Sequence, residues 1–336
     1  MRRTTVALTR FERNLNAQTG IALLAVLWAV TLLGLVALAL TNSVQAEIRT
    51  ATYRKEATQA YFLACGGVEA AILGIAYPLP ENPDNPPFWT WQQGQREGSV
   101  PFQSGRARLE IVNESGKLDL NAASRRQLIR FFEVGGVEPV AARQLVAAIL
   151  HWRGPVQPDD PEAGSLDEYY QRGSVRPRHA PFQSVEEVLN VRGMSREIFF
   201  GTVEVSREGV VRPQRGLGQD LTVATSLTQV NVNYASEFVL RSLPEMSPEL
   251  ARAIIQERAR APFKSLEDIG RRTALSLPDE ALPFLATGEG KTYSIVSVGE
   301  LAGSRVQRAV RAVVQIDPQG IPRHRVVAWY DDYSSD

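Results

Sequence analysis

An uninterrupted apolar stretch near the N-terminus, residues 21–40, constrains this chain more than any other feature. It contains no charged residue over twenty positions. Twenty helical residues span about 30 Å, which matches the hydrocarbon core of a bilayer. The residues before it carry four arginines against one glutamate, Glu12. Because basic flanks stay on the cytoplasmic side, the chain after residue 40 is predicted to lie on the opposite side of the membrane.

Three interpretations of this stretch are open from the residues alone. It can be a simple membrane anchor. It can be the core of a secretory signal peptide cleaved after Ala46, because Val44-Gln45-Ala46 has the small residues of a cleavage site, although the apolar run is longer than a usual signal core. Third, a basic leader that ends in Gly20 and leads directly into an apolar helix resembles the N-terminus of type IV pilin and pseudopilin precursors.

The pilin resemblance implies a maturation step. In that family a prepilin peptidase removes the leader on the cytoplasmic side of the membrane, and the new N-terminal residue is methylated. Here residues 1–20 would form the leader, and the cut would fall between Gly20 and Ile21. Ile21 would then carry the methyl group.

The residue at the fifth position after this junction indicates which family among the pilins and pseudopilins the chain resembles. Most pilins have a glutamate there, whose carboxylate pairs in the family's assembly scheme with the N-terminal ammonium of the subunit above, but this chain has Ala25. An unpaired charge in hydrocarbon is costly, so a subunit with no neighbour above has no use for that glutamate. The chain thus resembles the protein K family of the type II (general) secretion pathway, the proposed tip subunits, and residues 22–28 resemble their membrane helix.

The helical pattern continues beyond the apolar stretch and becomes amphipathic. From residue 41 to about 75, apolar residues recur at steps of three and four, with charged residues between them. A run of prolines then ends the helix, because proline lacks the backbone donor and clashes with the preceding turn. We predict one continuous helix, half in lipid and half packed on a sheet. The prolines are Pro78, Pro80, Pro83, Pro86 and Pro87.

Strand patterns lie on both sides of a long central segment. The expected strands fall within residues 100–120, 293–298, 306–316 and 325–330. With the amphipathic helix they predict a pseudopilin-like α/β domain of residues 41–118 and 288–336. The expected fold class is α+β: a pilin-like long N-terminal helix packed on an antiparallel sheet, with a large all-helical domain inserted between strands.

The central segment, residues 119–287, contains an internal repeat. Each copy has two helical patterns joined by a tight turn, and the first copy is longer by about 31 residues near 153–179. These units resemble helix-hairpin-helix modules, and paired helical units of this kind occur in the protein K family. The matching pieces are Asp119–Ser124 with Asn231–Ser236, and Ala180–Glu187 with Ala261–Asp268; the helical patterns are 125–132, 140–152, 237–243 and 248–258.

Helix-hairpin-helix modules often bind DNA through backbone N–H groups at a glycine-rich, electropositive turn. The first turn, Gly135-Gly136-Val137-Glu138, has a carboxylate near the position a phosphate would take, and the second turn, Glu245-Met246-Ser247, has no glycine. A structural role is therefore favoured. The alternative function is a membrane-anchored helix-hairpin-helix protein for DNA binding or uptake.

The extra residues of the first copy hold a cluster of carboxylates. Calcium prefers six to eight oxygen ligands, so such a loop is a candidate site, and the family resemblance implies calcium binding in this region. Nearby arginines and prolines equally favour a solvated acidic loop without an ion. The candidate ligands are Asp159, Asp160, Glu162, Asp167 and Glu168.

Other residues do not suggest an enzyme. Lysine plus arginine and aspartate plus glutamate both total 37, so no strong charge favours nucleic acid. Cys65 is the only cysteine, which excludes an internal disulfide bond. The three histidines, His151, His179 and His324, have no metal-ligand spacing. We therefore expect no catalytic residues.

The resemblance implies a minor pseudopilin at the tip of a type II secretion pseudopilus, initiating or limiting its assembly for protein export across the outer membrane. It implies a single-pass protein of the bacterial inner membrane with its C-terminal domain in the periplasm. The implied partners are minor pseudopilins I and J, the major pseudopilin, prepilin peptidase, the inner-membrane assembly platform, the secretin, exported proteins and membrane lipid, with no nucleic acid.

Overall fold

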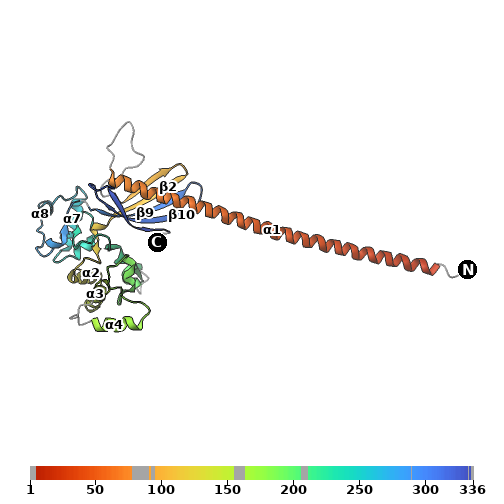
Figure 1. Cartoon of the computed structure of the whole chain (residues 1–336), viewed down its shortest axis with the longest axis horizontal. Helices are drawn as coiled ribbons and strands as arrows, with labels where there is room; N and C mark the ends of the chain where they lie inside the picture. The colour runs from red at the N-terminus through yellow and green to blue at the C-terminus, as the bar shows by residue number, and fades with distance from the viewer. Residues whose placement is uncertain are drawn as a thin grey trace, which may run out of the picture.

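A single helix dominates the shape of the molecule. The computed structural model describes residues 5–77, 91, 95–154, 163–205, 211–288, 290–331 and 333. Helix α1 (Thr5–Ala76) is 72 residues long, and its N-terminal part projects away from everything else (Figure 1). Side chains from Leu23 to Lys55 are all exposed. The predicted long N-terminal helix is confirmed, but its packed part begins only at Ala57.

The C-terminal part of α1 packs on a five-stranded antiparallel sheet. Ala60, Ala64, Val68 and Ala71 are completely buried, at the spacing that places residues on one helix face. Together with inward-facing strand residues they form one hydrophobic core. The strands follow the order β1 (Glu97–Phe102), β2 (Gly105–Asn113), β9 (Thr292–Leu301), β10 (Gln307–Ile316) and β11 (His324–Tyr330).

Two glycines set the distance between α1 and the sheet. A Cβ atom on Gly299 would lie 1.9 Å from the carbonyl oxygen of Ala60. A Cβ atom on Gly67 would lie 2.3 Å from the Oγ of Ser297. Real Cβ atoms do not come this close to other heavy atoms, so both positions require glycine for the helix to contact strand β9.

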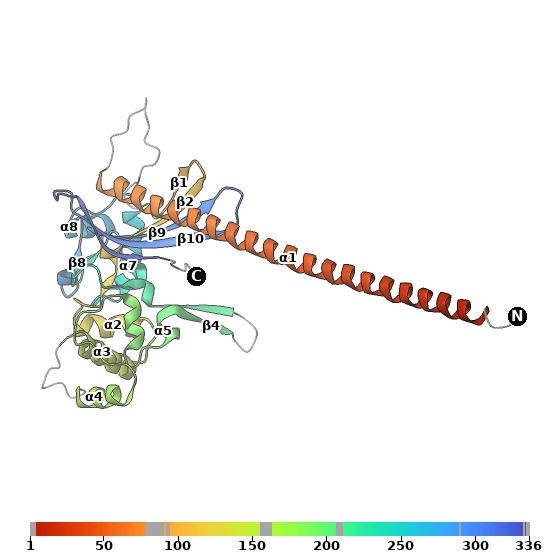
Figure 2. The same cartoon turned by 45° about the vertical axis from the view of Figure 1, so that its right-hand side comes forward.

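A second domain, which includes α2, α3, α7 and α8, is inserted between β2 and β9 (Figure 2). It has its own hydrophobic core. Phe131, Phe132 and Phe263 are among its largest fully buried side chains. Its elements are η1 (Glu114–Gly116), β3 (Leu118–Asp119), α2 (Arg125–Val134), α3 (Pro139–Arg153), α4 (Ala163–Arg172), η2 (Val185–Asn190), α5 (Arg196–Phe200), β4 (Gly201–Val205), β5 (Val211–Arg215), η3 (Gly218–Asp220), β6 (Leu221–Thr222), β7 (Val230–Asn231), α6 (Glu237–Arg241), α7 (Pro248–Arg258), α8 (Leu266–Thr273), η4 (Leu282–Phe284) and β8 (Leu285–Ala286).

The insertion is not purely helical. Each repeat is closed by a short parallel pair, β3 with β6 and β7 with β8. Strands β4 and β5 form an antiparallel hairpin, which the expected all-helical insertion did not include. Arg215 at the end of the hairpin pairs with the buried Asp220 at 2.6 Å, which fixes its base. Helix α4 lies in the segment that we expected to be an acidic loop.

The chain enters and leaves this inserted domain at one place. The Asn113 side-chain Nδ2 donates to the carbonyl oxygen of Gly290 at 3.3 Å. A Cβ atom on Gly290 would lie 2.1 Å from Asn113 Oδ1, so the two connecting segments are in direct contact. The insertion is therefore attached to the sheet through two adjacent segments.

Candidate functional site

The exposed face of α1 carries an apolar stripe. Val44, Ile48, Phe62 and Leu73 are exposed by 52, 59, 66 and 53 %. Residues eighteen apart in a helix complete five turns, so Val44 and Phe62 point the same way. This direction is opposite to Ala60 and Ala71, which face the sheet. The stripe therefore offers a surface for another helix to pack along α1.

The apolar segment of α1 meets the length and composition of a membrane span. Its most hydrophobic 18-residue window has a mean hydropathy of 2.7 and no buried residue. Gly20 and Ile21, the predicted cleavage junction, lie within the helical backbone of α1. Ala25 is exposed like its neighbours. Helix α1 is thus long and apolar enough to cross a membrane, and cleavage at the junction stays a prediction.

The predicted calcium ligands divide into two groups. Asp159, Asp160 and Glu162 lie outside the described residues. Asp167 and Glu168 lie on α4, but the Asp167 carboxylate is 3.2 Å from His151 Nε2 and the Glu168 carboxylate pairs with Arg172. In the described part of the chain, no group of three or more histidine, cysteine, aspartate or glutamate side chains could hold a metal ion. Calcium binding by this segment therefore stays a prediction, since three of its five candidate ligands lie outside the described residues.

The imidazole of His151 lies in a buried aromatic cluster. Its side chain is 2 % exposed, stacks parallel to Tyr170 at 6.1 Å and meets His179 edge-on at 4.9 Å. His179 Nδ1 is 3.0 Å from the backbone carbonyl of His151. These contacts join α3, α4 and the segment after α4, so the cluster holds the extra residues of the first repeat against its core.

Both repeats contain the same asparagine clamp. In the first, Asn121 Nδ2 donates to the Phe182 carbonyl at 3.0 Å, and Asn121 Oδ1 accepts from the Phe182 N–H at 2.8 Å. In the second, Asn233 makes the same two bonds to Phe263, at 3.0 and 2.8 Å. One amide side chain satisfies the donor and the acceptor of one residue's backbone. The clamp ties the start of each repeat to the segment after its longest helix.

Each repeat also has a partly buried arginine at the end of its longest helix. Arg153 of α3 donates to the carbonyls of Leu120 and Ala123, the latter at 2.8 Å. Arg258 of α7 donates to the two equivalent carbonyls at 2.7 and 2.6 Å. Burial lowers the pKa of both arginines. Because guanidinium remains charged at neutral pH, these two cations stabilise carbonyl groups of the turn that precedes the first helix of each repeat.

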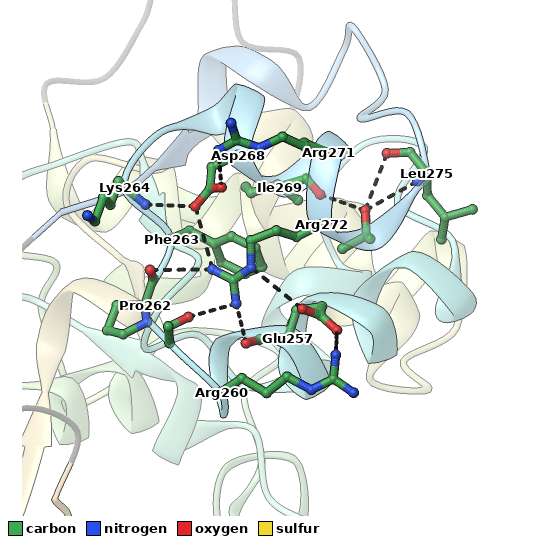
Figure 3. Close-up of polar contacts among 12 residues, drawn as sticks. Glu257, Arg260, Pro262, Phe263, Lys264, Asp268, Ile269, Arg271, Arg272 and Leu275 are labelled. Atoms are coloured by element: carbon green, nitrogen blue, oxygen red, sulfur yellow. Dashed lines mark hydrogen bonds and ion pairs between the residues drawn. The ribbon is translucent and has the colours of Figure 1, made fainter.

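Next to the asparagine clamps, the repeats use different side chains. In the second repeat the Arg272 guanidinium lies 4.3 Å from the centre of the Phe263 ring and pairs with Glu257 and Asp268, both at 3.5 Å (Figure 3). In the first repeat, the Trp152 indole covers the equivalent phenylalanine at 6.3 Å and 9°. A planar guanidinium and an indole can both lie against an aromatic ring, so the two equivalent phenylalanines are contacted by side chains of different chemistry.

The turn between α2 and α3 is closed to phosphate. The Glu138 carboxylate accepts hydrogen bonds from the N–H groups of Val140 and Ala141 at 2.9 and 3.0 Å. These are the groups that a DNA-binding turn would present to a phosphate. In the second repeat the Ser247 side chain accepts from the N–H of Leu250 at 3.1 Å. Both helix starts are therefore capped by the protein itself.

The cap on α3 should make its stability depend on pH. The backbone hydrogen bonds lower the pKa of Glu138 below its usual value. Its contribution is therefore complete above the unfolded pKa of about 4.3 and is lost as pH falls through the folded pKa. We expect Glu138→Ala to be less stable than the unmodified protein at neutral pH and equal to it in acid, measured by urea unfolding across a pH series. A difference independent of pH would contradict this assignment.

Comparisons with known proteins agree on one family. Two family models, both described as type II secretion system protein K, match residues 108–200 and 230–287. The chain is 28 % identical over 311 residues to type II secretion system protein K of Klebsiella pneumoniae, covering 84 % of this chain and 89 % of the relative. It is 24 % identical over 269 residues to the Pseudomonas aeruginosa protein of that name, covering 75 % of this chain and 76 % of the relative.

A solved structure shares the fold. The crystal structure of a GspK-GspI-GspJ complex from the enterotoxigenic Escherichia coli type 2 secretion system contains a chain that superposes with a TM-score of 0.56. The sequence identity is 16 %, and the match covers 88 % of this chain and 99 % of that one. The two chains thus share a fold over most of their length.

Proposed function

We propose that this chain, which belongs to the type II secretion system protein K family of minor pseudopilins, forms the tip of the pseudopilus. The observation that carries the proposal is the position of the inserted domain. It lies at the end of the molecule remote from the N-terminus of α1 (Figure 2). In a filament whose subunits stack along their N-terminal helices, a domain of this size at the outer end would block the addition of a further subunit above it.

Ala25 supports the same position. A negative charge in the membrane segment is useful only to a subunit that has a neighbour above it, whose N-terminal ammonium pairs with that charge. This chain has an alanine there. By accepting no subunit above it, the tip subunit would initiate or limit assembly. This role is structural and not catalytic.

The partners of this role would pack along the exposed stripe of α1. In the absence of a partner, Val44, Ile48 and Phe62 leave apolar side chains in water. Helices of other minor pseudopilins, proteins I and J, and of the major pseudopilin would cover them. The related complex of GspK with GspI and GspJ supports this choice of partners. The membrane assembly platform would hold the apolar segment before assembly.

The proposed topology follows from charge. The arginine-rich leader would stay in the cytoplasm, α1 would cross the inner membrane once, and both folded domains would lie in the periplasm. The alternative role in DNA binding is not favoured, because the Glu138 carboxylate occupies the backbone groups that would bind phosphate.

The N-terminal residue of the mature protein tests the class. We expect protein purified from membranes of a host with the peptidase to begin at N-methylated Ile21, because the peptidase would cut after Gly20. A Gly20→Leu variant should remain uncut. Intact-mass measurement and N-terminal sequencing distinguish the outcomes: a chain that begins at Glu47 would indicate ordinary secretion, and an unmodified chain that begins at Met1 would indicate a simple anchor. Either result would overturn the pseudopilin mechanism.

A further inference from the structure

A groove separates the sheet from the second repeat and is lined by residues of both. Its volume is about 580 Å³, which is within the range of ligand-binding clefts. From the sheet side it is lined by Trp91, Arg96 and Tyr293, and from the repeat by Tyr234, Ile255 and Arg258. The groove therefore lies between two domains that have separate hydrophobic cores. Helix α7 of the inserted domain lies next to the sheet in Figure 2.

Three arginines line the groove: Arg260, which pairs with Glu257, and Arg96 and Arg258. Arg96 is exposed and precedes strand β1. Arg258 is held in place, because its Nη1 donates to the carbonyls of Val232 and Ala235. Among the described side chains, no carboxylate forms an ion pair with Arg96 or Arg258. Burial lowers the pKa of Arg258, and the charge of Arg96 acts in the same direction, so the two guanidinium groups repel each other across the groove.

Aromatic and apolar side chains form part of the walls of the groove, beside its arginines and polar residues. The rings of Trp91 and Tyr293 meet edge-on at 5.7 Å between their centres. Ile255 is half-buried and packs against the core of the inserted domain. A ligand that fits this surface therefore needs negative charges for the arginines and apolar side chains for the walls. Bidentate carboxylates suit guanidinium groups, and the flat aromatic walls suit apolar side chains.

We propose that this groove binds a short acidic peptide segment of a partner protein, with glutamate or aspartate side chains on Arg96 and Arg258 and an apolar side chain against Trp91. An anion between the two arginines removes their repulsion, so binding would also fasten the inserted domain to the sheet. A nucleic acid is a poorer occupant, since a carboxylate already pairs with one of the three arginines of the groove and the whole chain has no excess positive charge. The proposal does not rest on the tip role and would hold for any partner that presents such a segment.

A labelled peptide tests the groove directly. The probe is a C-terminally amidated peptide of alternating glutamate and leucine, and fluorescence anisotropy measures its binding to the full-length protein in detergent. The matched probe has glutamine in place of glutamate. We expect the glutamate peptide to bind, and the glutamine peptide to bind at least about tenfold more weakly, because two charge-assisted hydrogen-bonded contacts are lost.

Two charge-reversal variants of the protein distinguish peptide binding in the groove from a general electrostatic attraction to the protein surface. Arg96→Glu should weaken binding of the glutamate peptide by at least about tenfold. Arg252→Glu, on the outer face of α7 with a side chain 58 % exposed, should leave the affinity unchanged. Circular dichroism would establish that both variants are folded. Absence of binding, equal affinity for the two peptides, equal effects of the two reversals, or tighter binding of a single-stranded oligonucleotide at the groove would each overturn the proposal.

Discussion

A Gly299→Ala substitution is expected to displace α1 from the sheet and to destabilise the pseudopilin-like domain by at least about 3 kcal/mol. The added methyl group would lie 1.9 Å from the carbonyl oxygen of Ala60 and 2.7 Å from the backbone N of Ala64. Both obstacles are backbone atoms of one continuous helix, so neither can rotate away. The helix must move as a whole, which opens its contact with β9 along several turns.

Denaturant unfolding of the full chain measures this effect. The matched control is Gly270→Ala on α8, where the added Cβ would lie 3.6 Å from the nearest atom, the Leu275 carbonyl oxygen. That change should be neutral or slightly stabilising, because alanine is the better helix former. The inserted domain has its own core, so its unfolding should be unaffected in the Gly299 variant. Equal stability of the two alanine variants would show that α1 does not pack on β9 as described.

An Asp119→Ala substitution should cost the first repeat about 4 kcal/mol. Asp119 is 1 % exposed and accepts five hydrogen bonds. Its Oδ1 accepts from the N–H groups of Asn121 and Ala122, and its Oδ2 accepts from the Thr225 hydroxyl and the N–H groups of Thr225 and Ser226. Alanine would remove the acceptor of these five partly buried hydrogen bonds, and would remove the negative charge near Arg153.

The duplication supplies the control for this prediction. Asn231 takes the equivalent position in the second repeat, but its Oδ1 accepts only from the Asn233 N–H, at 3.0 Å, and its Nδ2 donates to Gly288 at 3.1 Å. Asn231→Ala should therefore cost only about 1 to 2 kcal/mol. The free energies of unfolding of the two variants, measured in urea, give the comparison. Equal losses would mean that the network around Asp119 does not stabilise the first repeat.

The features that the sequence predicted well have long or repeated patterns. An apolar run of twenty residues and three-and-four spacing over the next thirty positions predict α1 with little ambiguity. Helix α7 begins at Pro248 and ends at Arg258, as predicted, because a serine N-cap precedes the proline. The duplication predicted that Asn121 and Asn233 take matching positions, but it did not predict their hydrogen bonds to Phe182 and Phe263.

Other features depended on contacts that spacing does not encode. Val44 and Ile48 fit the amphipathic pattern but face solvent, since the sheet begins to cover α1 only at Ala57. The hairpin of β4 and β5 was not predicted, because the alternation in β4 covers only residues 202–205 and Pro213 interrupts the pattern of β5. Ser184 precedes a short helical turn, as Ser265 does, but only the Ser265 side chain makes the capping bond.

The arginines that close each repeat were missed although the sequence holds a signal for them. Arg153 and Arg258 each end the longest helix of their copy. In both copies an Asn-x-Ala-Ser motif precedes the helices. Aligning the two copies by their helix ends would have placed both arginines at one position. Their partners are backbone carbonyls, which leave no trace in the side-chain pattern.

The contact between Asn113 and Gly290 has a consequence for how such proteins diversify. Because the two connections of the inserted domain touch, a chain could pass from β2 to β9 by a short turn, and the sheet with α1 would remain intact. Selection can therefore enlarge, exchange or reshape the inserted domain without disturbing the helix that a filament requires. Helix α1 and the sheet would then stay constant while the inserted domain varies, and the longer first repeat is an example of such variation.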